Sequence, residues 1–435
     1  MKGLKFICIP LVLAVTSMFF FPFEFNALPE LNTKKMMAAA ALVILLWNLL
    51  QKRELKMDKD FMYLSIVAGL VSVCGIIAVT YNNTEDYTYA TYISSFWVWW
   101  GGAYTSCSII RWVHGEVTIG LIIKYLVVVC ILQCCLALAI DSNVAFKKWV
   151  MSIFATGDGY FAKGNVQRMF GIGCSLDVAG SRFSAVLVMM IYAFTRNNEI
   201  KRWYTYLGFF AAFFFISFVG NMIARTTLIG LLVGFAYLGF VSLRQIKHLE
   251  RRYFLLWRWF IIILLIGIPI VVSIYQTDAR MRKNIRFGFE GFFSLVEKGH
   301  WEVSSNETLK SMYVWPDNAK TWIIGDAYFN NPVMIDPYYT GEITEGYYKN
   351  TDVGYLRFIF YFGVVGLLMF SFFFIEVGRT CMRHFPEWKV MFLMLLAVHF
   401  IVWAKVSTDI FLAFAPFLCF EDNIDENCLS DSRNV

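Results

Sequence analysis

The sequence predicts an all-α integral membrane protein with eleven or twelve transmembrane helices and one large outer loop. Of its 435 residues, 58% are hydrophobic and 16% are charged, whereas soluble domains carry about 25% charged residues. Apolar runs recur from residue 4 to residue 420, with one long interruption at 276–351. The formal net charge is +6, and the basic residues stand between the apolar runs. This arrangement is typical of a protein oriented in a lipid bilayer and not of nucleic-acid binding.

Each apolar run in turn is expected to form a helix that spans the membrane. The expected helices are 4–22, 36–51, 61–80, 90–112, 117–140, 174–194, 203–219, 226–243, 254–275, 352–376 and 388–404. The last apolar stretch, 408–420, is too short to span as a helix at about 1.5 Å per residue. It is either a re-entrant half-helix or the end of a tilted twelfth helix.

These helices divide the chain into four regions. Residues 1–275 hold the first nine transmembrane helices, 276–351 form the large loop subdomain, 352–420 hold the C-terminal helices, and 421–435 are a polar tail. The N-terminal segment resembles a signal peptide but lacks a convincing small-x-small cleavage site. We therefore expect it to remain as the first helix.

Lysine and arginine predict the orientation of the helices. They gather in the even-numbered loops, after helices two, six, eight and ten, whereas the loop YNNTEDYTY at 81–89 has no basic residue. Because cytoplasmic loops are enriched in lysine and arginine, the N-terminus is expected in the cytoplasm. The loops expected to face outward are 23–35, 81–89, 141–173, 220–225 and 276–351.

No motif for a cofactor accompanies the apolar runs. The ten cysteines include no CxxC pair, and those within apolar runs are expected to serve as small hydrophobic residues. The sequence has no Walker A loop and no HExxH, and its outer loops have no acidic pair of the DxD type. Nothing in these patterns requires a nucleotide or a metal ion.

Three arginines stand where an apolar helix tolerates charge poorly, because a buried arginine in a bilayer costs several kcal/mol. Arg182 lies near the expected outer end of helix six, Arg225 at the start of helix eight, and Arg168 just before helix six. Guanidinium groups gathered at this outer side would bind a phosphate or diphosphate bidentately. The alternative is that each arginine snorkels to the interface or pairs with Asp177.

The large loop begins with a basic segment, QTDARMRKNIRFGF, which contains Arg280. This segment is either a funnel for an anionic substrate or a contact with anionic lipid headgroups. At the other end of the loop, Asp352 and Tyr355 stand at the mouth of helix ten. Asp352 is either a base for an attacking sugar hydroxyl or an acid that caps the helix.

Lys405 and Asp409 interrupt the last apolar stretch at a spacing of four residues. Two opposite charges at this spacing pair with each other if the stretch is helical. Otherwise the two residues mark the outer turn that precedes the final short segment.

The order of these features resembles the Wzy-type polymerases of O-antigen and capsular polysaccharide repeat units, which are related to the O-antigen ligases. The similar segments are GSRFSAVLVMMIYAF, GNMIARTTLIGLLVGF, TWIIGDAYFNNP and TDVGYLRFIFYFGVVGLLMF, within 165–420. The ligases carry a histidine where this chain has Asp352, which favours a polymerase. The Arg-x(10)-Gly repeats of some polymerases have no clean counterpart here, because Arg168 to Gly180 is one residue too long.

The resemblance implies a metal-independent glycosyltransferase with a GT-C-like polytopic architecture in the bacterial inner membrane. Its substrate would be a polyprenyl-diphosphate-linked oligosaccharide, and its partners a flippase and a chain-length regulator. The catalytic residues would be Arg182 and Arg225, which hold the diphosphate, and Asp352, which acts as the base. The residues Arg168, Arg280 and Tyr355 would bind and position the substrate.

Two other functions remain open from the sequence. One is a ligase that joins a finished glycan to another acceptor. The other is a transporter or flippase of lipid-linked oligosaccharide. Transporters often contain internal repeats and charges near the midplane of the membrane. The two halves of this chain show no repeat, and its charges cluster at the outer ends of the helices.

Overall fold

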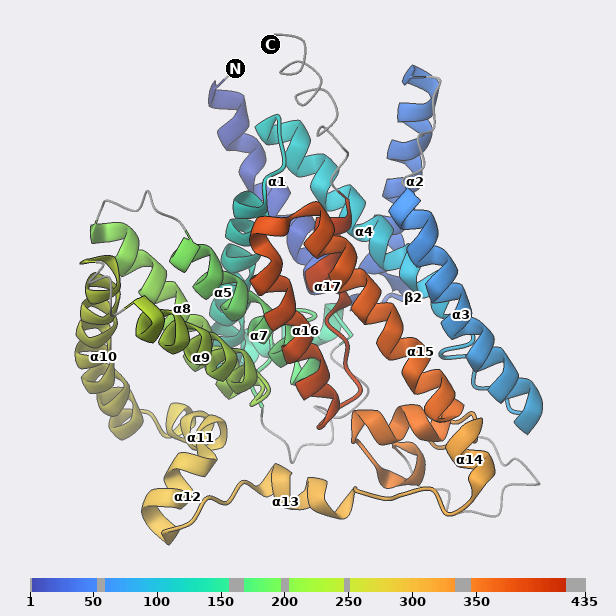
Figure 1. The fold of residues 1–435 in the computed structure, drawn as a ribbon. Helices are drawn as coiled ribbons and strands as arrows, with labels where there is room; N and C mark the ends of the chain where they lie inside the picture. The colour runs from blue at the N-terminus through green and yellow to red at the C-terminus, as the bar shows by residue number, and fades with distance from the viewer. Residues whose placement is uncertain are drawn as a thin grey trace.

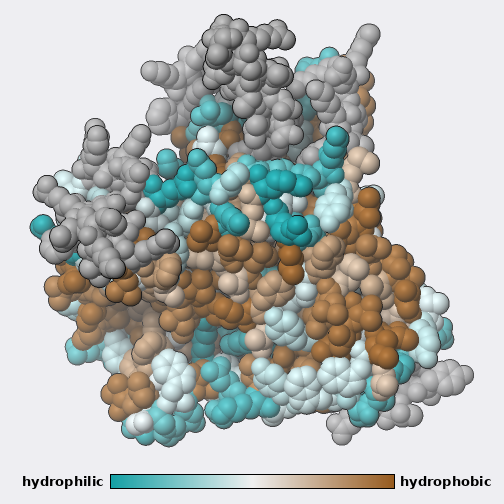
Figure 2. Space-filling view, viewed as in Figure 1, coloured by the Kyte–Doolittle hydropathy of each residue, from teal (hydrophilic) through white to brown (hydrophobic). Residues whose placement is uncertain are grey.

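The computed structural model describes residues 2–52, 59–155, 168–196, 203–245, 251–332 and 346–419. Within these ranges the protein is an all-α polytopic membrane protein (Figure 1), as predicted. Eight of the described helices are long and apolar enough to cross a membrane. Figure 2 shows a broad hydrophobic band across the helices, bordered on its lower side by hydrophilic residues.

The eleven predicted helices are all present within the described residues. They are α1 (Lys2–Phe20), α2 (Thr33–Lys52), α3 (Lys59–Asn82), α4 (Tyr92–His114), α5 (Ile119–Ser142), α7 (Leu176–Arg196), α8 (Trp203–Ile223), α9 (Thr227–Gln245), α10 (Arg251–Thr277), α15 (Gly354–His384) and α16 (Lys389–Trp403).

Short elements occupy the connections. A hairpin of β1 (Glu24–Phe25) and β2 (Leu28–Asn32) follows α1, and α6 (Val144–Ile153) follows α5. The large loop contains α11 (Ala279–Gly288), α12 (Glu290–Lys298), α13 (Ser304–Ser311), α14 (Ala319–Ile323) and η2 (Tyr348–Asn350). The short helix η3 (Pro386–Trp388) joins α15 to α16. The loop helices α11 to α14 lie together at one end of the bundle, at the bottom of Figure 1.

The loops fall into two groups at opposite ends of the bundle. The backbone N–H of Ala155 donates to the carbonyl of Glu24 over 2.9 Å, and Thr84 donates to the carbonyl of Ala327 over 3.1 Å. These bonds join loops that the charge pattern placed on the outer side. At the other end, Asp60 forms an ion pair with Arg383, so two predicted cytoplasmic connections meet there. The grouping of loops by charge therefore agrees with the structure.

The last apolar stretch returns through the bundle as a non-helical turn, which we call the unwound segment, followed by two short helices. After α16 ends, residues 404–410 are not helical, and α17 (Phe411–Phe414) and η4 (Ala415–Leu418) complete the segment. Leu418 lines a small cavity with Asp60, at the end opposite to the large loop. An extended residue advances about 3.3 Å and a helical one about 1.5 Å. The sixteen residues 404–419 are therefore long enough to return to the opposite end of the bundle. A fully helical segment of this length would have been too short.

Protein encloses the helical half of this return. Every residue of α17 and η4 is buried. In the non-helical stretch 404–410, only Val406 and Ile410 are buried, and Ala404 is exposed. The sulfur of Cys107 in α4 contacts the carbonyl of Pro416 at 3.6 Å, and the rings of Phe392 and Phe417 lie 5.2 Å apart. The returning segment is therefore held between α4 and α16.

Helix α15 bends sharply where α14 packs against it. Gly363 has φ 71° and ψ −177°, a conformation that is essentially restricted to glycine. The backbone N–H of Asp326 donates to the carbonyl of Phe360 over 2.6 Å, and that of Ala327 donates to Tyr361 over 3.0 Å. The start of α15 is consequently a separate outer piece, which Figure 1 shows turned away from the rest of the helix. This piece carries the residues of the expected site at the end of the loop.

We expect Gly363→Ala to destabilise the protein. A Cβ atom at this position would lie 2.1 Å from the carbonyl oxygen of Ile323, in addition to the strain of the backbone conformation. A strained conformation of this kind costs about 1–3 kcal/mol, so the unfolding temperature in detergent should fall. Gly208→Ala in α8 is the control, because nothing lies within 4 Å of its added Cβ. Equal unfolding temperatures for the two variants would contradict the assigned strain.

Candidate functional site

Small residues beside Arg182 lock α7 against α9. A Cβ on Gly180 would lie 1.9 Å from Oγ1 of Thr226, and one on Gly230 would lie 2.2 Å from Cα of Ser184. The hydroxyl of Ser184 donates to the carbonyl of Thr226 over 2.7 Å and accepts from the N–H of Gly230 over 3.0 Å. Positions 180 and 184 share one face of the helix, whereas position 182 lies about 200° away at 3.6 residues per turn. This packing therefore fixes Arg182 on the opposite face.

Arg182 is buried without a polar partner in the part of the chain that the structure describes. Its exposed fraction is 9%, and no described residue forms a hydrogen bond with its Nη1 atom. Its guanidinium lies 5.6 Å from the centre of the Phe21 ring. A buried charged group that lacks a hydrogen bond is costly, and such a group calls for a functional explanation. An anionic ligand would provide the missing acceptor.

Two further charged residues act on Arg182 electrostatically, and we call the three residues Lys34, Arg182 and Asp409 the deep site. Lys34 stands in the first turn of α2, where the neighbouring Thr33 anchors the chain: its hydroxyl donates to the carbonyl of Met18 over 3.1 Å. Asp409 belongs to the unwound segment, and its Oδ1 accepts from the N–H of Phe411 over 2.9 Å. Two cations and one carboxylate therefore lie close enough to act on one another electrostatically, without an ion pair between them.

A second group of charges lies nearer the large loop, and we call it the outer cluster. Its members are Arg168, Asp177, Arg225, Asp352 and Lys405. Lys405 interacts electrostatically with all of the other four. It does not form a helical pair with Asp409, because residues 404–410 are not helical. The unwound segment instead contributes Lys405 to the outer cluster and Asp409 to the deep site, and so connects the two.

Asp352 has the electrostatic properties of a group that exchanges protons near neutral pH. Burial, and then the nearby charge of Asp177, raise the pKa of Asp352 to about 7, while Arg357 and Lys405 act in the opposite direction. The interpretation of Asp352 as a helix cap is wrong. The N-cap of α15 is Val353, and the first turn of this helix contains no acidic residue. A carboxyl group that titrates near neutral pH can serve as a general base.

Arg225 ties the large loop to the start of α9. Its Nε donates to the carbonyl of Phe287 over 2.9 Å and its Nη1 donates to Oγ of Ser305 over 3.0 Å. Its Nη2 lies 2.6 Å from a carboxylate oxygen of Glu290. The guanidinium groups of Arg168 and Arg225 lie 4.8 and 4.2 Å from the centre of the same Phe287 ring. Each nitrogen of the Arg225 guanidinium thus has a protein partner, whereas Nη1 of Arg182 has none among the described residues.

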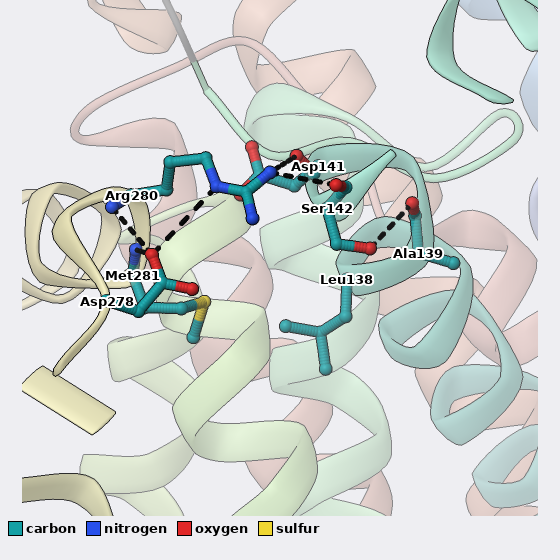
Figure 3. A pocket seen from close by; sticks show the side chains of 7 residues that line it. All are labelled: Leu138, Ala139, Asp141, Ser142, Asp278, Arg280 and Met281. Carbon is teal, nitrogen blue, oxygen red and sulfur yellow. Dashed lines mark hydrogen bonds and ion pairs between the residues drawn. The ribbon is translucent and has the colours of Figure 1, made fainter. Parts of the chain in front are cut away.

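The remaining two predicted residues lie apart from the deep site. Arg280 donates from Nη1 to the carbonyl of Ser142 over 2.8 Å, beside a cavity of about 230 Å³ between α5 and α11 (Figure 3). The hydroxyl of Tyr355 donates to the carbonyl of Phe400 over 2.8 Å and thereby joins α15 to α16. The structure thus brings Arg168, Arg225 and Asp352 into one cluster and places Arg182 in the deep site. These hydrogen bonds of Arg280 and Tyr355 connect them to neither of these groups.

Sequence reasoning did not assign a role in the site to Arg357, which connects three segments. Its Nη1 donates to Oγ of Ser407 over 2.8 Å, and its Nη2 donates to the carbonyl of Phe329 and to Oδ1 of Asn330. Its guanidinium lies 3.6 and 4.2 Å from the ring centres of Phe329 and Tyr347. Arg357 therefore anchors both the unwound segment and the end of the large loop. An arginine within the run RFIFYF was the available signal.

Arg225→Lys should loosen the large loop. Lysine keeps the charge opposite Glu290 but lacks the planar fork that also reaches Phe287 and Ser305. Each lost hydrogen bond to a charged group contributes about 1.5–3 kcal/mol, so hydrogen exchange in residues 279–311 should become faster. Arg286→Lys, which affects an exposed ion pair with Glu297 in the same loop, is the control. Unchanged exchange in Arg225→Lys would refute its role as an anchor.

No protein-family model, no curated protein and no solved structure matches this chain. The assignment of function therefore depends on the residues and their geometry.

Proposed function

We propose that this protein is a membrane glycosyltransferase that polymerises polyprenyl-diphosphate-linked oligosaccharide repeat units. The reaction would take place at the outer face of the bacterial inner membrane and would produce O-antigen, capsule or exopolysaccharide. The observation that carries the proposal is Arg182, a buried guanidinium whose Nη1 has no acceptor among the described residues. The basic loops at the opposite end of the bundle support an outward position for this site. Twelve passes in a GT-C-like arrangement complete the proposed architecture.

The proposed reaction transfers the growing glycan from its carrier to the next carrier-linked unit. A hydroxyl at the non-reducing end of the acceptor attacks the anomeric carbon of the donor, and the bond from that carbon to the diphosphate oxygen breaks. The hydroxyl proton passes to Asp352, whose raised pKa of about 7 suits a base at neutral pH. The diphosphate leaves with the bonding electron pair, and its new negative charge is stabilised by Arg182 and by the cations of the outer cluster.

Reconstitution of the purified protein in lipid vesicles with a polyprenyl-diphosphate-linked repeat unit tests this proposal. The expected product is a ladder of glycans of increasing length, still attached to the carrier. Transfer of the glycan to a different acceptor, without a ladder on the carrier, would indicate a ligase. The absence of any new glycosidic bond would reject both enzymes. A cell lacking the gene should likewise make single-unit glycans, and the intact gene should restore long chains.

One observation favours a second candidate, a flippase of the same lipid-linked oligosaccharide. Discontinuous segments that bear charged residues are typical of transporter binding sites, and residues 404–410 form an unwound stretch with Lys405 and Asp409. A flippase would move the lipid-linked unit between leaflets and leave its covalent structure unchanged. A fluorescent lipid-linked unit that becomes accessible to an external quencher, without elongation, would favour this candidate over the polymerase.

A further inference from the structure

The deep site contains two cations, Lys34 and Arg182, and no described group forms an ion pair with either of them. Within the described residues, the ammonium of Lys34 forms no hydrogen bond or ion pair, and Arg182 forms no ion pair. The two side chains come from α2 and α7, which are far apart in sequence. The half-buried Lys34 also interacts with the exposed Glu24, so the site extends from the buried guanidinium toward the outer surface.

Asp409 is near these cations, but its hydrogen bond is to the backbone N–H of Phe411. One of its carboxylate oxygens accepts the N–H of Phe411 at 2.9 Å, which holds it at the end of the unwound segment. It acts electrostatically on both Lys34 and Arg182 without forming an ion pair with either. The three groups together carry a net charge of about +1 when all are ionised. The excess positive charge of this arrangement favours an additional anion.

We propose that Lys34 and Arg182 bind one phosphate or diphosphate group and that Asp409 is an internal counter-ion that competes with this group. The proposal deepens the proposed function and relies on it only for the source of the anion. A guanidinium fork binds phosphate oxygens bidentately, and an ammonium contributes a compact charge. The ring of Phe21 lies 5.6 Å from the Arg182 guanidinium, and an apolar neighbour lowers the local dielectric constant and so strengthens the attraction of this guanidinium for an anion.

Asp409 would set how readily the anion leaves. A diphosphate that binds too tightly after glycan transfer would block the next cycle. The nearby carboxylate repels the bound anion and stabilises the empty site, so it weakens binding in both ways. Asp409→Asn keeps an oxygen that can accept the N–H of Phe411 and removes only the charge. This substitution should therefore tighten anion binding, whereas loss of a cation should weaken it.

The test measures binding of inorganic diphosphate and of a short-chain polyprenyl diphosphate to the full-length protein in lipid nanodiscs. Lys34→Gln should weaken binding about ten-fold or more, and Asp409→Asn should tighten it about ten-fold. Lys35→Gln is the matched control, because Lys35 is adjacent in sequence but exposed, and its charge is the weakest of those that act on Lys34. Its affinity should change much less than that of Lys34→Gln. Opposite signs for two substitutions within one site cannot arise from general misfolding.

The outcomes distinguish a free phosphate from a lipid-borne one. They also distinguish failure of the anion site from failure of the polymerase proposal. Equal binding of both probes supports the site and identifies the phosphate chemistry alone as the ligand, whereas binding of the lipid probe only supports a lipid-borne ligand. Weaker or unchanged binding in Asp409→Asn, or unchanged binding in Lys34→Gln, overturns the inference. If the opposite shifts are found in a protein that makes no glycosidic bond, the polymerase proposal fails and the anion site stands.

Discussion

Arg182→Met is expected to abolish elongation of the lipid-linked glycan while leaving the protein at least as stable as the wild type. Removing one group that stabilises developing negative charge typically lowers the rate about 10²–10³-fold. Folding should not suffer, because Nη1 of Arg182 has no acceptor among the described residues and burial of an uncompensated charge is costly. The flexible methionine side chain fills most of the same apolar space beside Phe21.

The measurement combines the ladder assay with thermal unfolding in detergent. Arg357→Met is the matched control, because it also removes a buried arginine but breaks hydrogen bonds to Ser407, Phe329 and Asn330. This control should lose both stability and activity, whereas Arg182→Met should lose activity alone. Arg182→Lys should fall between the wild type and Arg182→Met, because it retains the charge without the bidentate fork. Full-length glycan from Arg182→Met at normal protein level would remove Arg182 from the mechanism.

The sequence predicts much of this fold because apolar length and loop charge are local properties. All eleven predicted helices occur at the expected places in the described residues, with ends displaced by a few residues, except that α15 extends eight residues past its expected end. The two groups of loops also follow from charge alone. The return of the chain at 404–419 was not predictable, because a non-helical turn followed by two short helices has the same composition as one short apolar helix. Its position depends on the contacts of Pro416 with α4 and of Phe417 with α16.

The candidate site was predictable only in part, for a related reason. Arg182 and Arg225 give the same signal in sequence, a single arginine in an apolar run. Their environments differ because Arg225 is saturated by Phe287, Glu290 and Ser305, which come from a loop distant in sequence. Lys34 gives no signal at all, since a lysine just before an apolar helix is an ordinary interface residue. Only the folded structure brings it close enough to Arg182 for the two charges to interact.

We expect the rate of glycan elongation to depend on pH through the ionisation of Asp352. If Asp352 is the base, the active form is its ionised form, and its pKa of about 7 sets the midpoint. The rate should rise about ten-fold per pH unit below 7 and level off above it. The charged and titratable groups that act on this carboxyl are Asp177, Arg357, Lys405 and Tyr347. Asp352→Asn should lower the rate about 10²–10⁴-fold and remove this dependence on pH.

The same pKa shift predicts that the stability of the folded protein decreases with rising pH, whereas the rate of elongation increases. The folded protein raises the pKa of Asp352 from its ordinary value of 3.8, so between this value and about 7 the folded state binds more protons than the unfolded state. The contribution of Asp352 to stability is therefore present at low pH and is lost as the pH rises through this window. Asp352→Asn, which stays neutral, should unfold at a higher temperature than the wild type at pH 8 and at a similar temperature at pH 4.

Together the two readouts distinguish a base from a merely structural carboxyl group. A structural role for Asp352 would lower activity and stability together in the Asn variant, whereas a base held partly desolvated for catalysis gives lower activity with higher stability at alkaline pH. Asp317→Asn, which alters an exposed carboxyl of the same loop, should change neither profile. If the Asn variant keeps the wild-type midpoint near pH 7, another group supplies the proton acceptor. The remaining carboxylate of the outer cluster, Asp177, would then be the next residue to test.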